Sequence, residues 1–165
     1  MRFSVTERIA AHRDDIEAAL ADPQYYASLA EAASNLEAPV LLSATVTDGV
    51  LHTSVRYRFA GDISGPAAMA LDRDKLTWVI DSRIDLASHE GQLTVIPDHY
   101  DGLLRCQASI TLVEEEGQTV ETIAGELDVS IPLIGATAEK VILAGFTQHL
   151  EREAAALAAF CANPT

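Results

Sequence analysis

The amino-acid sequence predicts an α+β fold in which one curved, seven-stranded antiparallel sheet wraps around a long C-terminal helix, with two short helices after the first strand. Between residues 40 and 131, apolar and polar side chains alternate, so that each strand has one dry and one wet face. After Pro132 the apolar spacing becomes helical, and this helix is the only element long enough to cover the dry face of the sheet. The chain of 165 residues, 48% of them hydrophobic, fits one domain over residues 1–165.

The N-terminal part of the chain predicts a strand followed by two helices. Residues 2–9 alternate between apolar and polar side chains, whereas residues 11–21 have the apolar spacing of a helix. Asp22-Pro23 stops this helix and begins another, with an aspartate at the N-cap and a proline in the first turn. We expect the second helix to end near Asn35.

A β-hairpin follows the two helices. Its first strand begins at Val40 and turns at Asp48-Gly49, a dipeptide that favours two-residue hairpin turns. The returning strand over residues 51–59 has the clearest alternation in the chain. In the first strand of the hairpin, the side chains expected on the inner face are Val40, Leu42, Ala44 and Val46.

Four further strands and the closing helix complete the predicted fold. A loop and a short helical turn, together spanning residues 60–71, precede a strand over residues 76–86 that is expected to turn at Glu90-Gly91. The remaining strands are predicted over residues 93–97, 104–112 and 123–131. The closing helix is predicted from Leu133 to Phe160. Its expected inner face consists of Ile134, Ala138, Val141, Ile142, Phe146, Leu150 and Leu157.

Charge and hydropathy exclude several classes of function. The 11 Lys and Arg residues against 25 Asp and Glu residues give a net charge of −14, which repels nucleic acids and anionic membrane surfaces. The longest wholly apolar runs, residues 141–146 and 154–162, are far shorter than the roughly 18 residues of a membrane span. The first residues do not resemble a secretory signal, because Glu7 and Arg8 interrupt any apolar region. We therefore expect a cytoplasmic protein that does not bind nucleic acid.

The sequence contains no motif that indicates a metal or a cofactor. It has no P-loop, no dinucleotide-binding glycine motif and no nucleophile elbow. Residues 98–101 carry ligand-type side chains, but their spacing beside Gly102 is typical of a turn. Cys106 and Cys161 stand alone and are expected to be buried, reduced thiols. We therefore expect neither a metal nor a cofactor.

Small side chains on the predicted inner surface indicate a cavity. Protein interiors are close packed, so small residues on facing elements leave a space that a ligand or water must fill. The small inward residues are Ala44, Thr53, Ser82, Ala108, Gly125, Ala138 and Gly145. The residues expected to contact a bound molecule are Val55, Tyr57, Trp78, Ile80, Ser82, Ala108, Ile110, Leu127, Ile142, Gly145, Phe146 and His149.

Several of these residues have a second interpretation. Tyr57 and Trp78 can orient a ligand through a hydroxyl or an indole N–H, or they can be ordinary core aromatics. His149, with Glu153 one turn further on, can act as a general base together with Tyr57, or it can be a satisfied residue at the edge of the apolar stripe. Gly145 destabilises a helix by about 1 kcal/mol relative to alanine, so we expect a strand or a ligand close to it.

Glu7 continues the inward parity of Phe3 and Val5 in the first strand. A buried carboxylate needs a partner such as Arg105, or a ligand. The alternative is that the strand ends before Glu7.

The order of elements resembles the helix-grip fold of the START-like (SRPBCC) superfamily, which includes birch-pollen-allergen-like proteins and polyketide cyclases. The resemblance covers the whole chain. Two stretches resemble an uncharacterised bacterial branch of this superfamily: Leu76-Thr77-Trp78, and Ile131-Pro132-Leu133-Ile134-Gly135 followed by Glu139-Lys140. The resemblance implies an apolar cavity for lipids, sterols, polyketides or other hydrophobic molecules. It implies no shared catalytic residue.

Three functions follow from this pattern. The first is non-catalytic binding of a hydrophobic small molecule or lipid between the sheet and the C-terminal helix, as a carrier or sensor. The second is a cyclase, aromatase or hydrolase that uses the same cavity, with His149 and Tyr57 as candidate catalytic residues. The third is a ligand-free interaction module with a packed interior and an exposed apolar patch.

Overall fold

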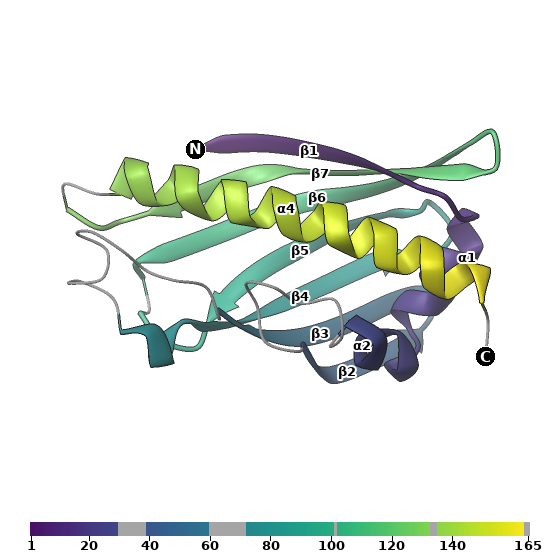
Figure 1. Cartoon of the computed structure of the whole chain (residues 1–165), viewed down its shortest axis with the longest axis horizontal. Coiled ribbons are helices and arrows are strands. Elements are labelled where there is room, and N and C mark those ends of the chain that lie inside the picture. Colours follow the sequence, from purple (N-terminus) through teal and green to yellow (C-terminus); the bar gives the residue numbers. More distant parts are fainter. Residues whose placement is uncertain (30–38, 60–71, 101, 133–134, 164–165) are drawn as a thin grey trace.

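In the computed structural model, which describes residues 1–29, 39–59, 72–100, 102–132 and 135–163, one seven-stranded sheet curves around a long helix (Figure 1). The strand order is β1-β7-β6-β5-β4-β3-β2. Every neighbouring pair is antiparallel, so the N-terminal strand lies beside the last strand of the sheet. The predicted α+β architecture is confirmed.

The element boundaries follow the period of the sequence. The strands are β1 (Arg2–Ile9), β2 (Val40–Thr47), β3 (Val50–Arg58), β4 (Thr77–Asp85), β5 (Glu90–Pro97), β6 (Leu104–Glu115) and β7 (Gln118–Val129). The helices are α1 (Arg13–Leu20), α2 (Pro23–Leu29) and α4 (Gly135–Ala162), with a 3-10 turn η1 over Arg73–Lys75. None of these helices is both long and apolar enough to cross a bilayer. The predicted end of the second helix, the segment 60–71 and Ile134 lie outside the described residues.

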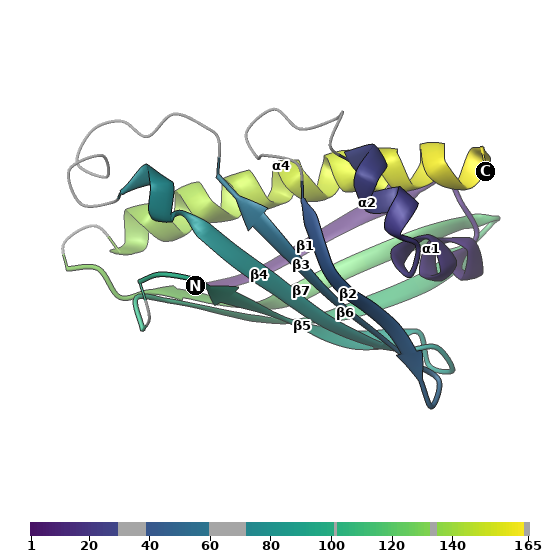
Figure 2. The same ribbon diagram turned by 90° about the horizontal axis from the view of Figure 1, so that it is seen from below.

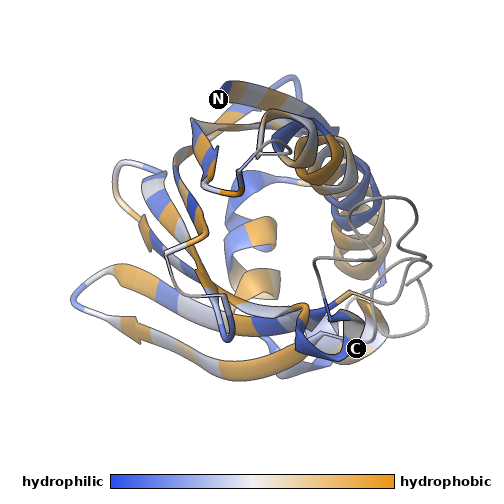
Figure 3. Ribbon diagram, turned by 90° about the vertical axis from the view of Figure 1, so that its left-hand side faces the viewer, coloured by the Kyte–Doolittle hydropathy of each residue, from blue (hydrophilic) through white to orange (hydrophobic). Residues whose placement is uncertain are grey.

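Helix α4 runs along the concave side of the sheet (Figure 2). Seen from one end, the strands curve around the helix (Figure 3). The fully buried residues of α4 are Leu150, Ala154 and Leu157, all in its C-terminal half. The N-terminal half packs against the core only through partly buried side chains such as Leu143 and Phe146. The helix is therefore held most firmly at its C-terminal end.

Two glycines on the inner face allow the sheet to curve. Gly125 of β7 lies opposite Ala108 of β6, and a Cβ atom added to Gly125 would overlap the carbonyl oxygen of Gln107 and lie 2.6 Å from the Ala108 Cα. A Cβ atom on Gly91 of β5 would overlap the carbonyl oxygen of Arg83. Backbone approaches this close are open only to glycine, and they bend the sheet toward its dry face.

Both two-residue hairpin turns have the backbone that their sequences favour. Asp48 and Gly49 have φ angles of 51° and 76°, and Glu116 and Gly117 have φ angles of 52° and 78°. Positive φ at both central residues matches the right-handed twist of the flanking strands. The hairpin predicted at Asp48-Gly49 is confirmed.

The predicted inner face of β2 is wrong in part, because a β-bulge shifts its register between Leu41 and Ser43. Before the bulge Leu41 pairs with Val55 and packs on the core, whereas Leu42 is exposed. After the bulge Ala44 faces inward opposite Thr53. One extra residue in a strand exchanges the inward and outward faces for all residues of that strand that lie on one side of the bulge.

The turn predicted at Glu90-Gly91 is also misplaced, because both residues belong to β5. The chain turns over residues 86–89, where an Asp85 carboxylate oxygen accepts hydrogen bonds from the backbone N–H groups of Ala87 and Ser88 at 2.8 and 3.0 Å. His89 ends the turn with a φ angle of 58°. Aspartate chemistry at the start of the turn therefore decides its position.

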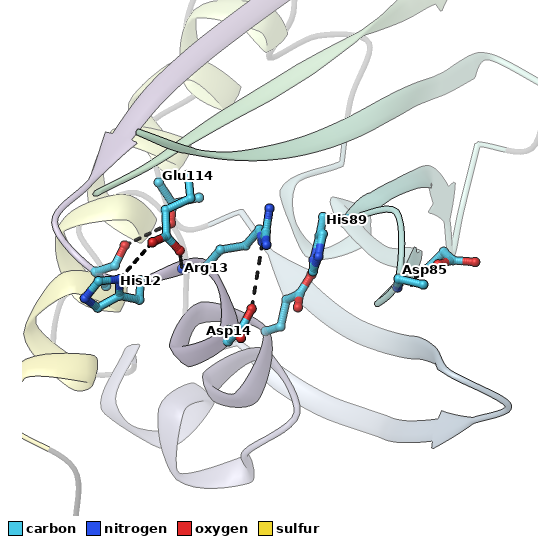
Figure 4. A network of polar contacts seen from close by, with 10 residues as sticks. His12, Arg13, Asp14, Asp85, His89 and Glu114 are labelled. Atoms are coloured by element: carbon cyan, nitrogen blue, oxygen red, sulfur yellow. Dashed lines mark hydrogen bonds and ion pairs between the residues drawn. The ribbon is translucent and has the colours of Figure 1, made fainter. Parts of the chain in front are cut away.

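Polar contacts fasten α1 to the end of the sheet (Figure 4). The Glu114 carboxylate accepts a hydrogen bond from the backbone N–H of Arg13 at 3.3 Å and lies 3.0 Å from His12 Nδ1. One turn further along the helix, Glu17 is buried with its Oε1 2.8 Å from His89 Nδ1. These contacts hold α1, and with it α2, across one end of the sheet.

The glycine positions give a test of the curvature. Gly125→Ala should reduce the free energy of unfolding by about 1–3 kcal/mol, because the added methyl group meets backbone atoms that cannot move independently. Gly145→Ala in α4 is the matched change with the opposite expectation. It should stabilise the protein by about 1 kcal/mol, because nothing lies within 4 Å of the added atom. Urea denaturation of both variants measures the two effects, and equal destabilisation would contradict the description of both sites.

Candidate functional site

The inner face of the sheet and residues 146–157 of α4 line a partly open cavity of about 70 Å³. Its apolar wall consists of Val55, Ile80, Ile84, Leu93, Ile110 and Ile123 from the sheet, Phe146, Leu150 and Leu157 from α4, and Leu20 from α1. Its polar lining consists of Tyr26, Thr53, Tyr57, Ser82, Glu121, His149 and Glu153. The cavity therefore has an extensive apolar wall and one group of ionisable side chains.

The Thr53 and Ser82 hydroxyls are a satisfied pair. They face each other across β3 and β4 with 2.7 Å between their oxygens. Because each hydroxyl meets the hydrogen-bonding need of the other, these two residues need no ligand to justify their burial.

Glu121 has no such partner. It lies on β7 with the parity of Ile123, and its carboxyl group makes no hydrogen bond or ion pair with any residue that the structure describes. Burial, followed by the nearby carboxylates of Glu153 and Glu7, raises its pKa to about 8. Glu121 is therefore mostly protonated at neutral pH and ionises only above about pH 8.

His149 and Glu153 lie one turn apart on α4 and face the same space. The distance from His149 Nε2 to the Glu153 Oε2 oxygen is 3.6 Å, and this nitrogen has no hydrogen-bond partner among the described residues. The other Glu153 oxygen accepts a hydrogen bond from the Tyr25 hydroxyl at 3.4 Å. Helical spacing brings the histidine and the carboxylate together, and α2 supplies the tyrosine.

Tyr57 stands between two aromatic rings. The indole of Trp78 stacks on it with 6.2 Å between ring centroids, and the His149 imidazole meets it edge-on at 5.1 Å. Only 4% of Tyr57 is exposed, and its hydroxyl has no hydrogen-bond partner among the described residues. Burial, followed by the charge of Glu153, raises the pKa of Tyr57, so this phenol stays neutral.

Most of the predicted strand residues lie where the sequence indicates. Of the residues expected to contact a ligand, those that line the cavity are Val55, Tyr57, Ile80, Ser82, Ile110, Phe146 and His149. Trp78 lies behind Tyr57. Ala108 is buried beside Gly125, and Leu127 belongs to a separate cluster around Cys106.

The predictions for Val141, Ile142 and Gly145 are corrected by the structure. Val141 and Ile142 are 68% and 37% exposed, and Gly145 is exposed with nothing within 4 Å of an added Cβ. The inner stripe of α4 runs instead through Leu143, Phe146, Leu150 and Leu157. In the apolar run Val141-Ile142-Leu143, side-chain type does not distinguish the inner face, so the packing of Leu150 and Leu157 fixes the rotation of the helix.

The sequence reasoning missed Glu121, although a signal existed. Glu121 has the same parity as Leu127, which the sequence predicts on the inner face, and as the buried Ile123. Strand β1 does continue past Glu7, which lies half-buried opposite Glu121. The expected partner Arg105 is exposed and pairs in register with Asp128.

Two other groups of polar residues lie outside the cavity. On the outer face, His52 and Ser54 both contact the same Asp81 oxygen, at 2.9 and 2.7 Å. A serine and a histidine that share one acceptor are not arranged as a catalytic triad, in which the histidine lies between the other two residues. Asp98, which follows β5 directly, accepts a hydrogen bond from Arg56 at 2.9 Å.

The second group comprises Asp14, Glu17 and His89, whose ligand atoms lie within 4.8 Å of one another. His89 Nδ1 already contacts Glu17, and the Arg13 guanidinium lies 3.8 Å from Asp14 (Figure 4). The positive charge of Arg13 and the contact between His89 and Glu17 account for this group, which attaches α1 to the sheet.

Cys106 and Cys161 are both free, and burial raises the pKa of the Cys106 thiol to about 11, which disfavours a reactive thiolate.

The curved sheet around α4 is the helix-grip fold of the START-like class, and solved structures share it. The crystal structure of TTHA0849 from Thermus thermophilus matches with a TM-score of 0.65 and 12% identity, over 98% of this chain and 97% of that chain. The Zhui aromatase/cyclase from Streptomyces sp. R1128 matches with a TM-score of 0.61 and 14% identity, over 98% and 93%. A START superfamily protein from Mycobacterium smegmatis matches with a TM-score of 0.56 and 17% identity, over 99% of each chain.

At these identities the likeness concerns the fold alone. Residues 4–161 match the sequence model of the family described as "Protein of unknown function (DUF2505)", and the chain belongs to this family. A comparison with curated proteins gives no match.

Glu121 gives a pH-dependent test of the site. The folded protein keeps the Glu121 proton up to a pH of about 8, whereas the unfolded chain releases it near 4.5. The contribution of this group to stability is therefore complete below pH 4.5 and is lost as the pH rises to 8. Glu121→Gln removes this loss. The stability of the variant relative to the wild type should thus increase between about pH 5 and 8, by a few kcal/mol at most, since one pKa unit corresponds to about 1.4 kcal/mol.

Denaturant titrations at a series of pH values measure this difference. Glu126→Gln is the matched control, because Glu126 lies on the outer side of the same strand in an exposed ion pair with Arg2. A difference between Glu121→Gln and wild type that does not change with pH would show that Glu121 ionises freely in the folded protein.

Proposed function

We propose that the protein is a cytoplasmic, non-catalytic carrier or sensor that binds a hydrophobic small molecule between the sheet and α4. The observation that carries this proposal is the cavity beneath α4, with its extensive apolar wall. A pocket with an apolar wall and a few convergent polar groups is the usual form of a small-molecule site. The similarity in fold to an aromatase/cyclase and to a START superfamily protein also supports the proposed binding function.

The size of the cavity restricts how such a molecule binds. The space of about 70 Å³ is well below the roughly 300 Å³ at the lower end of pockets for drug-sized ligands. A larger molecule therefore needs α4 to move away from the sheet. The N-terminal half of α4 is the part that can do so, because it has no buried apolar side chain, although its displacement must also break the hydrogen bond between Glu139 and the Val129 backbone.

Filling the cavity tests the binding function. Val55→Phe places a larger side chain into the cavity from β3 and should abolish uptake of a ligand, while the existing space limits the loss of stability to about 1–3 kcal/mol. Native mass spectrometry of protein purified from its own host, followed by denaturation and extraction, should give a bound apolar compound for wild type and none for the variant.

The matched control is Val79→Phe, which makes the same change on the outer face of β4, where Val79 pairs with Arg56. This variant should retain the compound. If wild-type protein carries no compound and takes up no added hydrophobic probe, the binding function is wrong. The search then moves to a protein partner, for which the exposed Val141 and Ile142 on α4 are the first surface to test.

A catalytic use of the same cavity is the second candidate, and the free His149 Nε2 favours it. This nitrogen lies 3.6 Å from a Glu153 carboxylate oxygen, and the His149 ring contacts the ring of the neutral Tyr57, so the residues needed to move a proton lie together at the cavity. If the extracted compound is converted by the protein, His149→Ala should reduce turnover by about 10²-fold or more, the usual contribution of a general base. The rate is measured under single-turnover conditions. Unchanged turnover would remove His149 from the mechanism.

A further inference from the structure

The ionisable residues of the cavity restrict the chemistry of its ligand. Glu121 on β7 and Glu153 on α4 both line the cavity, and no Lys or Arg is present among the lining residues that the structure describes. Once Glu121 is ionised, above about pH 8, a ligand that carries a carboxylate or a phosphate would meet two negatively charged side chains and no Lys or Arg among the described residues there. An anionic head group is therefore the least suitable partner for this site.

Unpaired groups in the cavity indicate that a partner is absent. Tyr57 is 4% exposed and its hydroxyl has no hydrogen bond to a described residue, and the buried His149 Nε2 has none either, although both residues line the cavity. Glu121 likewise has no hydrogen bond or ion pair within the part of the chain that the structure describes. Buried polar groups are normally satisfied, and each exception needs an explanation. The His149 Nε2 is such an exception, and it belongs to the same cavity lining as the two unpaired side chains of Tyr57 and Glu121.

The other groups around Glu121 do not supply the missing charge. Glu7 faces it from β1, Glu153 from α4 and Tyr25 from α2. The register pairs Glu7 directly with Glu121, and like charges placed opposite each other in a sheet are destabilising. Three carboxyl groups from three elements thus share one region without a basic side chain among the described lining residues.

We propose that the cavity binds an apolar molecule with a protonated amine, whose ammonium group donates hydrogen bonds to Glu121 and Glu153. This inference rests on the proposed binding function and names the class of ligand. The ammonium group supplies the positive charge that the acids lack, and its remaining proton can be donated to the Tyr57 hydroxyl oxygen. The apolar part of the molecule lies against the wall formed by residues such as Val55, Ile80 and Ile110.

Three probes of equal length test the head group: n-hexylamine, 1-hexanol and hexanoate. Each is titrated into isotopically labelled protein at about pH 8.5, and the dissociation constant is taken from the chemical shifts of cavity methyl groups such as those of Val55 and Ile110. We expect the amine to bind at least about tenfold more tightly than the alcohol, as a charge-assisted hydrogen bond predicts, and hexanoate to bind most weakly. The titrations are run at about 0.3 M salt, because the net charge of −14 attracts amines to the surface nonspecifically.

Glu121→Gln separates the charge of the site from its shape. The variant should lose the preference for the amine, with about a tenfold weaker affinity for n-hexylamine and an unchanged affinity for 1-hexanol. Glu126→Gln, on the outer face of β7, should leave all three affinities unchanged. Circular dichroism confirms that each variant is folded, and Glu153→Gln provides an independent second variant.

The pH dependence of the amine affinity is a second measurement, and a general change in packing would not alter it. In wild-type protein the amine must displace the proton of Glu121 below about pH 8, so its affinity should fall by about tenfold or more between about pH 8.5 and pH 6. His149 is unchanged in the variant, so its contribution is the same in both proteins. Any part of the pH dependence that is missing in Glu121→Gln therefore belongs to Glu121.

The possible outcomes are distinct. Preferential binding of the amine that depends on Glu121 supports the inference. Binding of the alcohol or of hexanoate as tightly as the amine overturns the inference and leaves the proposed binding function intact. If none of the three probes shifts the cavity methyl groups, both the inference and the binding function are wrong.

Discussion

The structure depends on the curvature of one sheet around one helix. A seven-stranded sheet with a single dry face needs a cover, and α4 is the only long element among the described residues that can supply it. Close backbone approaches at Gly91 and Gly125 let the strands bend toward that helix. The helix in turn is held by Leu150, Ala154 and Leu157 in its C-terminal half. Because the concave surface and the helix do not match completely, a cavity remains between them. The position of the cavity is thus a geometric consequence of the fold, while its chemistry depends on a few side chains.

The sequence predicts the sheet well because strand parity is a local property. Alternation predicts which side of β3 and β4 faces inward, and Val55, Tyr57, Ile80 and Ser82, which it places there, all line the cavity. Prediction fails where tertiary contacts decide. The bulge in β2 turns Leu42 outward, and the run Val141-Ile142-Leu143 has no intrinsic face, so only the packing of α4 shows that Leu143 is the inward residue. Glu121 was overlooked for a different reason. A pattern based on hydrophobicity does not expect a carboxylate on the dry face, even where parity places one there.

The other carboxylates of the protein make Glu121 unusual. Buried Glu17 has His89 at 2.8 Å, Glu114 contacts His12, and Glu139 accepts a hydrogen bond from the backbone of Val129 at 3.1 Å. Each of these acids contributes to the attachment of one element to another. Glu121 attaches nothing within the described structure, and the neighbouring carboxyl groups of Glu7 and Glu153 make its ionisation more costly. A destabilising group that makes no structural contact is typical of a functional site, where stability is given up for binding or catalysis.

The small cavity and the uneven packing of α4 together indicate how binding and helix position are coupled. His149 and Glu153 lie in the firmly packed half of the helix, next to Leu150 and Leu157, so the polar end of a ligand meets groups that are held in place. The N-terminal half has no fully buried residue among those described and can yield to the apolar part of the ligand. If the protein has the proposed function, the groups that bind the head group therefore stay in place. A longer apolar part of the ligand displaces the N-terminal half of α4 further from the sheet. In a sensor α4 stays displaced while the ligand is bound, whereas in a carrier α4 returns to the sheet and covers the ligand. The position of α4 in the bound protein therefore decides between these two roles.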